Sequence, residues 1–152
     1  MSVRQYISGN IRNKADFCVT YIPHDSGKIK TQIHSQTSVL HGSKLHDICI
    51  TTLFDLHINH GRLKVIDNGG QYFVLQARIE AALKKAHPKN QFESLPELKK
   101  HARYKSKADR FRRSRLYLPG NQGKLMLNAG IHKPDAIILD LEDSVAPKEK
   151  DS

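Results

Sequence analysis

Apolar and polar positions alternate in two stretches near the start of the chain. In residues 17–22 nearly every position is apolar, which is typical of a β-strand covered on both faces. In residues 28–33 isoleucine and threonine alternate with lysine and glutamine, which is typical of a strand with one wet face. The sequence His-Asp-Ser-Gly at 24–27 has the composition of a turn. The two strands are therefore expected to pair as an antiparallel hairpin.

Two later stretches, the second of which ends at residue 86, show apolar side chains at the 3.6-residue period of a helix. Ser43 is a suitable N-cap for the first helix, because its hydroxyl can accept a hydrogen bond from an amide of the first turn. Residues 63–66 predict a third strand, residues 67–70 a turn, and residues 71–86 a second helix. The inward positions are Leu45, Cys49, Thr52, Leu53 and Leu56 in the first helix and Leu75, Ile79, Ala82 and Leu83 in the second. The order ββαβα predicts a small α/β sandwich in which two helices cover three strands.

A different arrangement is predicted near the end of the chain. Residues 116–118 and 136–139 are short apolar runs that each break into a polar loop, and residues 123–130 predict a helix that ends at Gly130. Strand, helix and strand at this spacing form a βαβ unit with parallel strands and a right-handed crossover. Both polar loops then follow the carboxyl ends of parallel strands, where α/β proteins place their chemistry.

Three acidic residues follow the second of these strands. Asp140, Glu142 and Asp143 come directly after a run that is expected to be buried. Burial of a carboxylate costs free energy unless a cation or hydrogen-bond donors compensate it. One interpretation is a site that contacts a cation or a polar ligand. In the alternative, Asp140 caps a turn while Glu142 and Asp143 lie in water.

Two motifs frame this unit. Arg-Ser-Arg-Leu-Tyr-Leu-Pro-Gly-Asn occupies residues 113–121, and Leu-Asp-Leu-Glu-Asp-Ser-Val-Ala-Pro occupies residues 139–147. In order and spacing they resemble the opening of the citrate lyase β-subunit family, which is related to the HpcH/HpaI aldolases. The resemblance implies a carbon–carbon lyase with a TIM-barrel fold. Two strands cannot close such a barrel, so the chain is expected to supply the first βαβ of an incomplete one.

The same resemblance implies roles for individual residues. It places Asp140, Glu142 and Asp143 in the wall of the metal and substrate pocket. The residues implied to face a substrate carboxylate or CoA are Arg113, Arg115, Pro119, Gly120 and Asn121. The family binds Mg²⁺ through acids on later strands, so no metal ligand is expected within this chain.

A second resemblance covers the N-terminal two-thirds of the chain. Residues 63–70 and 77–83 are similar to a strand, turn and helix of the citrate lyase γ-subunit family, which consists of small acyl carrier proteins. That family carries a phosphoribosyl-dephospho-CoA arm on a serine two residues before the position of Asp16. Lys14 stands there instead, so no arm is expected at this position. The nearest upstream hydroxyl, that of Ser8, is the weaker alternative.

The net charge of +10 is concentrated in one segment of the chain. Residues 84–115 hold twelve Lys and Arg against three Asp and Glu, which gives this segment +9. We interpret residues 89–111 as a solvated basic linker between a carrier-like domain, 1–88, and a barrel-type fragment, 112–152. Two alternatives stay open, namely contact with an anionic ligand such as a CoA phosphate and contact with a nucleic acid.

Composition narrows the class of protein further. Cys18 and Cys49 lie within apolar runs and predict buried thiols in a reducing cytoplasm. No apolar stretch approaches the roughly 20 residues of a membrane span, and the N-terminus has no signal-peptide core. The nine histidines show none of the spacings of common metal motifs.

Together these observations predict a cytoplasmic component of a citrate lyase-type complex that is not active alone. Its expected partners are other citrate lyase subunits or the remainder of a split lyase chain. The alternative is a non-catalytic interaction subunit that retains the folds without a prosthetic arm or a complete active site.

Overall fold

The structure is a computed structural model, and it describes residues 4–95, 100, 103, 105 and 107–150. The chain divides into two compact units. The first comprises the residues up to Ser94, and the second runs from Leu95 to Lys150. We call them the N-terminal unit and the C-terminal unit. The sequence-based boundaries after residues 88 and 111 stay predictions.

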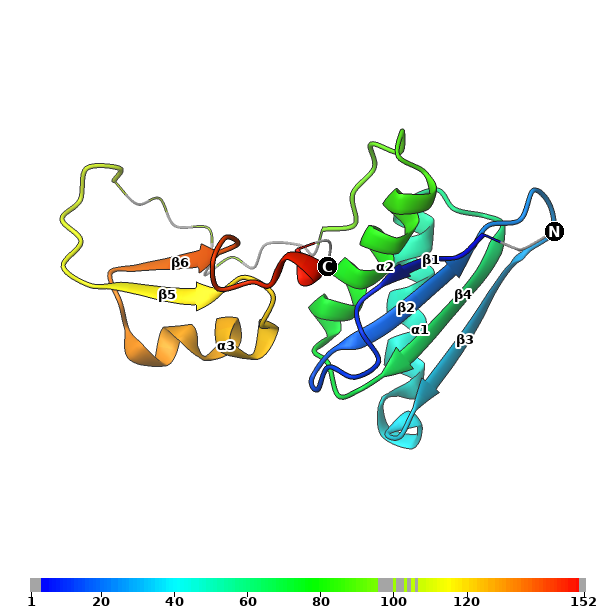
Figure 1. The fold of residues 1–152 in the computed structure, drawn as a ribbon, viewed down its shortest axis with the longest axis horizontal. Coiled ribbons are helices and arrows are strands. Elements are labelled where there is room, and N and C mark those ends of the chain that lie inside the picture. Colours follow the sequence, from blue (N-terminus) through cyan, green and yellow to red (C-terminus); the bar gives the residue numbers. More distant parts are fainter. Residues whose placement is uncertain (1–3, 96–99, 101–102, 104, 106, 151–152) are drawn as a thin grey trace. The chain divides into compact units, whose positions relative to one another are not determined.

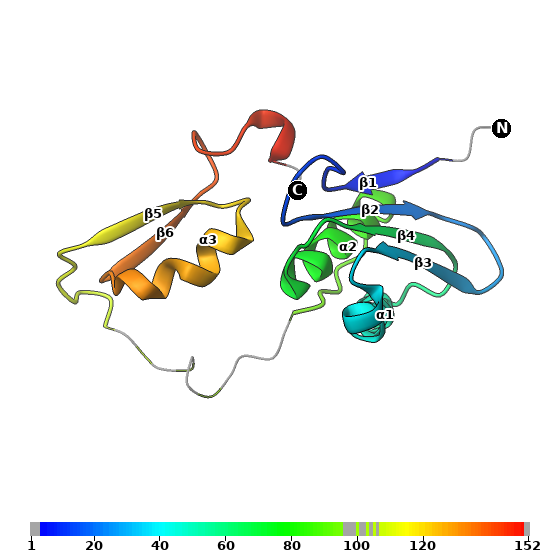
Figure 2. The same cartoon turned by 90° about the horizontal axis from the view of Figure 1, so that it is seen from below.

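The N-terminal unit is a four-stranded sheet with two helices on one of its faces (Figures 1 and 2). The strand order is β1-β2-β4-β3, and only β3 and β4 run parallel. The elements are β1 (Tyr6–Ser8), β2 (Phe17–Ile22), β3 (Ile29–Ser35), α1 (Ser38–Asp55), β4 (Gly61–Asp67) and α2 (Tyr72–Ala86).

The expected hairpin between β2 and β3 is wrong. β4 lies between these strands, so that Val65 pairs with Val19 on one side and with Ile33 on the other. The reason is burial. The fully buried Leu63 and Val65 suit a central strand, whereas the half-polar β3 suits an edge. The expectation of three strands is also wrong, because β1 adds a fourth. With three residues, β1 is too short to show an alternating pattern in the sequence.

The predicted start of the first helix is wrong as well. α1 begins at Ser38 after Thr37, so Ser43 lies inside the helix and is not its N-cap. The first turn carries the exposed Val39 and Leu40, so the burial pattern does not mark the start of the helix. Both predicted inward faces are confirmed, because all nine of those side chains are buried. All of them except Thr52 belong to the hydrophobic core of the unit, together with Phe17, Val19, Tyr21, Leu63 and Val65 of the sheet.

The C-terminal unit confirms the predicted βαβ order. Its parallel strands are β5 (Arg115–Pro119) and β6 (Ala136–Asp140), joined through α3 (Gly123–Asn128) and the 3₁₀ helix η2 (Ala129–His132), and a last 3₁₀ turn is η3 (Pro147–Glu149). Gly130 lies inside η2 and does not end the helix. The chain turns at Lys133, whose φ of 45° is left-handed. Both units are therefore mixed α/β, as predicted.

Among the helices of the described residues, none has the length and apolar character that crossing a membrane requires.

Candidate functional site

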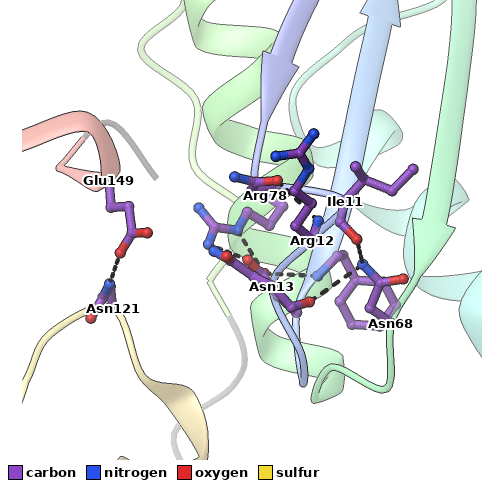
Figure 3. Close-up of polar contacts among 10 residues, drawn as sticks. Ile11, Arg12, Asn13, Asn68, Arg78, Asn121 and Glu149 are labelled. Atoms are coloured by element: carbon purple, nitrogen blue, oxygen red, sulfur yellow. Dashed lines mark hydrogen bonds and ion pairs between the residues drawn. The ribbon is translucent and has the colours of Figure 1, made fainter. Parts of the chain in front are cut away.

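Lys14 lies in the loop between β1 and β2, and its side chain is exposed. Its neighbour Ala15 has a φ of 57°, a left-handed conformation that glycine adopts more easily than alanine. The Ala15 amide donates to the Asn68 carbonyl oxygen at 3.0 Å. Figure 3 shows the Asn68 side chain reaching back to this loop, where its Nδ2 donates to the carbonyl oxygens of Ile11 and Asn13 at 2.7 and 3.3 Å. The loop is thus fixed against the turn that follows β4.

A buried ion pair anchors the same loop to α2. Arg78 donates from Nε and Nη2 to the two carboxylate oxygens of Asp16, at 3.0 and 2.8 Å, and each residue is 6% exposed. Asp16 also accepts a hydrogen bond from the Phe17 amide at 2.7 Å. Sequence reasoning missed this pair. The signal for it was an arginine on the inward face of α2, next to Ile79.

Ser8 is an unsuitable place for a bulky group. It is 2% exposed, and its hydroxyl has no hydrogen-bond partner among the described residues. The next residue, Gly9, has a φ of 82°, and a Cβ there would lie 1.9 Å from the Phe17 carbonyl oxygen. An arm on Ser8 would therefore require β1 to separate from the sheet.

A cavity of about 470 Å³ opens beside Lys14. Its lining combines two cations, three amide side chains, a carboxylate and Thr37 with the backbone of the neighbouring turns. The lining residues are Ile11, Arg12, Asn13, Lys14, Gln36, Thr37, Asp67, Asn68 and Gly69. A second cavity of about 360 Å³ shares Thr37, Asp67 and Gly69 with the first and extends to His41 and Tyr72. The two cavities therefore adjoin one another at the ends of β3 and β4, and together we call them the groove.

In the C-terminal unit, Asp140 caps a turn. Its oxygens accept hydrogen bonds from the amides of Glu142 at 2.8 Å and Ser144 at 3.3 Å. The Glu142 amide first, and the Ser144 side chain next, hold the pKa of the Asp140 carboxyl below its usual range. Glu142 and Asp143 are exposed. This geometry is the second of the two interpretations that the sequence left open.

The loops after β5 and β6 lie together, as expected for parallel strands. The Gly120 amide donates to the Asp140 carbonyl oxygen at 2.7 Å, and a Cβ on Gly120 would lie 2.3 Å from the Leu141 side chain. Pro119 pairs with Asp140 across the two strands. The Asn121 side chain donates to Glu149 at 2.7 Å, which ties the first loop to η3 (Figure 3).

Arg113 and Arg115 are not part of that loop cluster. Both are exposed at the amino-terminal end of β5, whereas Gly120 and Asn121 follow its carboxyl end. A five-residue strand between them spans roughly 15 Å. The structure therefore divides the candidate substrate-binding residues between two ends of one strand.

Asp135 joins the starts of β5 and β6, and sequence reasoning missed it. One of its carboxylate oxygens accepts hydrogen bonds from the amides of Arg113 and Ser114 at 2.9 and 3.0 Å. The Ser114 hydroxyl donates to the same oxygen at 3.1 Å. These bonds lower the pKa of the Asp135 carboxyl, with the Ser114 amide as the largest cause. Within the arginine motif, Ser114 therefore holds the start of β5 against the start of β6.

The described residues do not fit a magnesium ion. No group of three or more His, Cys, Asp and Glu side chains in the described part of the chain could hold a metal.

The predicted basic linker is only partly described. Residues 96–99, 101–102, 104 and 106 lie outside the described residues. In the described part, Arg112 donates from Nη1 to the carbonyl oxygens of Ala108 and Arg110, both at 3.0 Å. Arg110 donates to the carbonyl oxygen of Asp135. The Arg112 bonds are local, whereas the Arg110 bond joins the segment before β5 to the start of β6.

In comparison with known proteins, the two units match two different family models. The N-terminal unit, a small α/β domain with a loop fixed by a buried ion pair, matches the family model ACP, the malonate decarboxylase delta subunit (MdcD), over residues 4–86. Because this match covers more than half of the chain, the chain belongs to this acyl carrier protein family. Residues 113–152 match the model of the HpcH/HpaI aldolase/citrate lyase family.

Individual relatives divide in the same way. The chain is 26% identical over 86 residues to the citrate lyase acyl carrier protein of Fusobacterium nucleatum, across 57% of this chain and 90% of that protein. It is 54% identical over 43 residues to the citrate lyase subunit beta of Haemophilus influenzae, and 49% identical over 43 residues to that of Escherichia coli K12. These stretches are 28% of this chain and 15% and 14% of the two beta subunits. No solved structure matches the chain.

Proposed function

We propose that this chain is a component of a citrate lyase-type complex. In it, an acyl-carrier-like domain is fused to the beginning of a β-type lyase that cleaves a carbon–carbon bond of an acyl thioester. One observation carries the proposal: a single chain joins a unit similar to a citrate lyase acyl carrier protein to a unit similar to a citrate lyase subunit beta. Proteins that act in one reaction are common partners in a fused chain, because the fusion raises their effective concentration.

In this proposal the C-terminal unit is the first βαβ of a TIM barrel. The parallel pairing of β5 with β6 through α3 supports it, since a barrel of this type repeats that unit. Asp140, Glu142 and Asp143 then form one wall of the pocket at the carboxyl ends of the strands. Gly120 and Asn121 lie at the same end, so they are the better candidates to contact substrate or CoA. Magnesium and its ligands belong to the complete lyase.

A further polypeptide is proposed to cover the C-terminal unit. Tyr117 is 62% exposed, Leu139 50% and Leu141 65%, although strands of a parallel sheet are normally covered on both faces. Among the described residues, the sheet of this unit has two strands, so each has an unpaired edge. The other citrate lyase subunits or the remainder of a split lyase chain would bury these groups.

One observation favours a second candidate function, a non-catalytic subunit. The position at which the resembled family carries its arm is the exposed Lys14, whose amine cannot form the phosphodiester of that arm. The alternative hydroxyl of Ser8 is buried. Such a subunit would keep the carrier's place in the complex without its chemistry.

Reconstitution tests membership of the complex. The tagged chain, expressed together with the other citrate lyase subunits, should co-purify with them. An excess of the chain should also lower the turnover of an assembled citrate lyase, because it occupies the carrier's place without an arm. A basic protein of similar size serves as the control. If the chain neither co-purifies nor inhibits more than this control, the proposal is wrong.

A further inference from the structure

The groove at the ends of β3 and β4 has three chemically different parts. At one end it is lined by Arg12 and Lys14, in the middle by Asp67, and at the far end by Tyr72 and His41. It lies outside the carboxyl ends of the parallel strands of the sheet, which is where open α/β sheets bind ligands.

The cationic end suits a phosphate group. Arg12 and Lys14 are both exposed, and neither forms an ion pair with another described residue. A guanidinium binds phosphate oxygens in pairs, and a nearby ammonium adds a second positive charge. The side-chain amides of Asn13 and Asn68 line the same cavity, although Asn68 already donates to the loop.

The middle of the groove suits hydroxyl donors. The Asp67 carboxylate accepts one hydrogen bond on each oxygen, from the Ser35 hydroxyl at 2.7 Å and from the Gly69 amide at 2.8 Å. A carboxylate has about four acceptor sites, so two remain. Ribose hydroxyls are typical donors to an acidic residue at the end of a strand.

The far end suits an aromatic ring. Tyr72 is 39% exposed, and its hydroxyl forms a hydrogen bond with His41 Nδ1 at 2.8 Å. The His41 and Tyr72 rings meet edge to face with their centroids 6.1 Å apart, which orients the tyrosine. A partly exposed tyrosine ring in a groove can stack on a nucleobase.

We propose that this groove reversibly binds a nucleoside diphosphate, with its phosphates at Arg12 and Lys14, its ribose at Asp67 and its base on Tyr72. The first cavity alone, at about 470 Å³, lies within the range of small-molecule sites and exceeds the space that a free phosphate needs. This inference goes beyond the proposed function and does not depend on it.

Nuclear magnetic resonance of the full chain tests the site directly. The side-chain amide groups of Asn13, Gln36 and Asn68 line the cavity, so their signals are the ones to follow. Titration with ADP should shift these signals saturably. Adenosine, which lacks the phosphates, and pyrophosphate, which lacks the nucleoside, should each bind at least about tenfold more weakly.

Variants separate the two ends of the groove. Arg12→Gln with Lys14→Gln should weaken ADP binding by at least about tenfold, because two charge-assisted contacts are lost. The matched control, Lys28→Gln with Lys30→Gln, removes the same charge at the opposite end of β3 and should bind as the unaltered chain does. Tyr72→Leu should weaken the binding of ADP but not that of pyrophosphate.

Three results would overturn the inference. The first is no saturable shift of the three amide groups at millimolar ADP. The second is an equal loss of affinity in the Lys28 and Lys30 control, which would indicate attraction by net charge alone. The third is equal affinity for pyrophosphate and ADP, which would remove the nucleoside from the ligand. Because the altered side chains are exposed, the backbone spectrum of each variant verifies that it remains folded.

Discussion

The pair of Arg78 and Asp16 places two charges in the interior of a small domain. Removal of one partner leaves the other buried and uncompensated, so Arg78→Ala should lower the free energy of unfolding by about 3–5 kcal/mol. Lys84→Gln is the matched control, because Lys84 pairs with Glu80 at 2.7 Å on the surface of the same helix. That change should cost less than about 0.5 kcal/mol. Urea unfolding measures both, and similar losses would contradict the structural role of the buried pair.

Cys49 makes the stability of the N-terminal unit depend on pH. Burial raises the pKa of its thiol to about 12, whereas an unfolded thiol titrates near about 8.5. Above about pH 8.5 the unfolded chain loses a proton that the folded chain keeps. The free energy of unfolding should then fall by about 1.4 kcal/mol per pH unit, and this effect is absent below that pH.

Cys49→Ala tests this linkage. Between about pH 8 and about pH 10 the unaltered chain should lose about 2 kcal/mol more stability than the variant does. Each protein is compared with itself at the two pH values, so the cavity left by the substitution does not enter. Equal pH dependence in the two proteins would show that the thiol does not titrate as its burial implies.

At the scale of elements, β5 and β6 form a two-stranded sheet, which is marginal in water without further cover. We therefore predict that the amides of residues 137–139 exchange with deuterium much faster than those of Leu63 and Val65 in β4. Both groups lie in one chain, so β4 is an internal reference for a strand whose side chains are fully buried. Slow exchange at 137–139 in the purified monomer would contradict the proposal that another polypeptide completes this unit.

At the scale of the whole molecule, the resemblance makes two predictions about chemistry. The first is that the chain alone does not cleave citryl-CoA or citramalyl-CoA in the presence of magnesium, because the resembled lyases bind the metal through later strands. A complete citrate lyase serves as the positive control. Measurable turnover by the chain alone would show that this expectation is mistaken.

The second prediction concerns the prosthetic arm. With the arm-transferring enzyme present, the chain should keep its unmodified mass, because Lys14 has no hydroxyl and Ser8 is buried. Lys14→Ser combined with Ala15→Gly should gain the mass of the arm, since glycine relieves the left-handed backbone at residue 15. Intact mass spectrometry measures both. Attachment of the arm to the unaltered chain would support a carrier function. If the double variant does not gain the arm, the non-catalytic subunit is favoured.

The sequence by itself determined the features that depend on near neighbours along the chain. The inward faces of α1 and α2 followed from a period of 3.6 residues, because one helix has only one way to turn a stripe of apolar side chains inward. The parallel pairing of β5 with β6 followed from strand, helix and strand in sequence, because a crossover through a helix returns the chain in the same direction. The two motifs around Gly120 and Asp140 carried the resemblance to the lyase family.

The tertiary structure alone decided which distant residues meet. The place of β4 between β2 and β3 depends on which strand buries most apolar surface, and turn composition at 24–27 does not report that. Asp16 and Arg78 are 62 positions apart, and the groove combines residues from Arg12 to Tyr72. A local pattern predicts only which face of its own helix or strand is buried. Which residues contact that face depends on the packing of the whole unit.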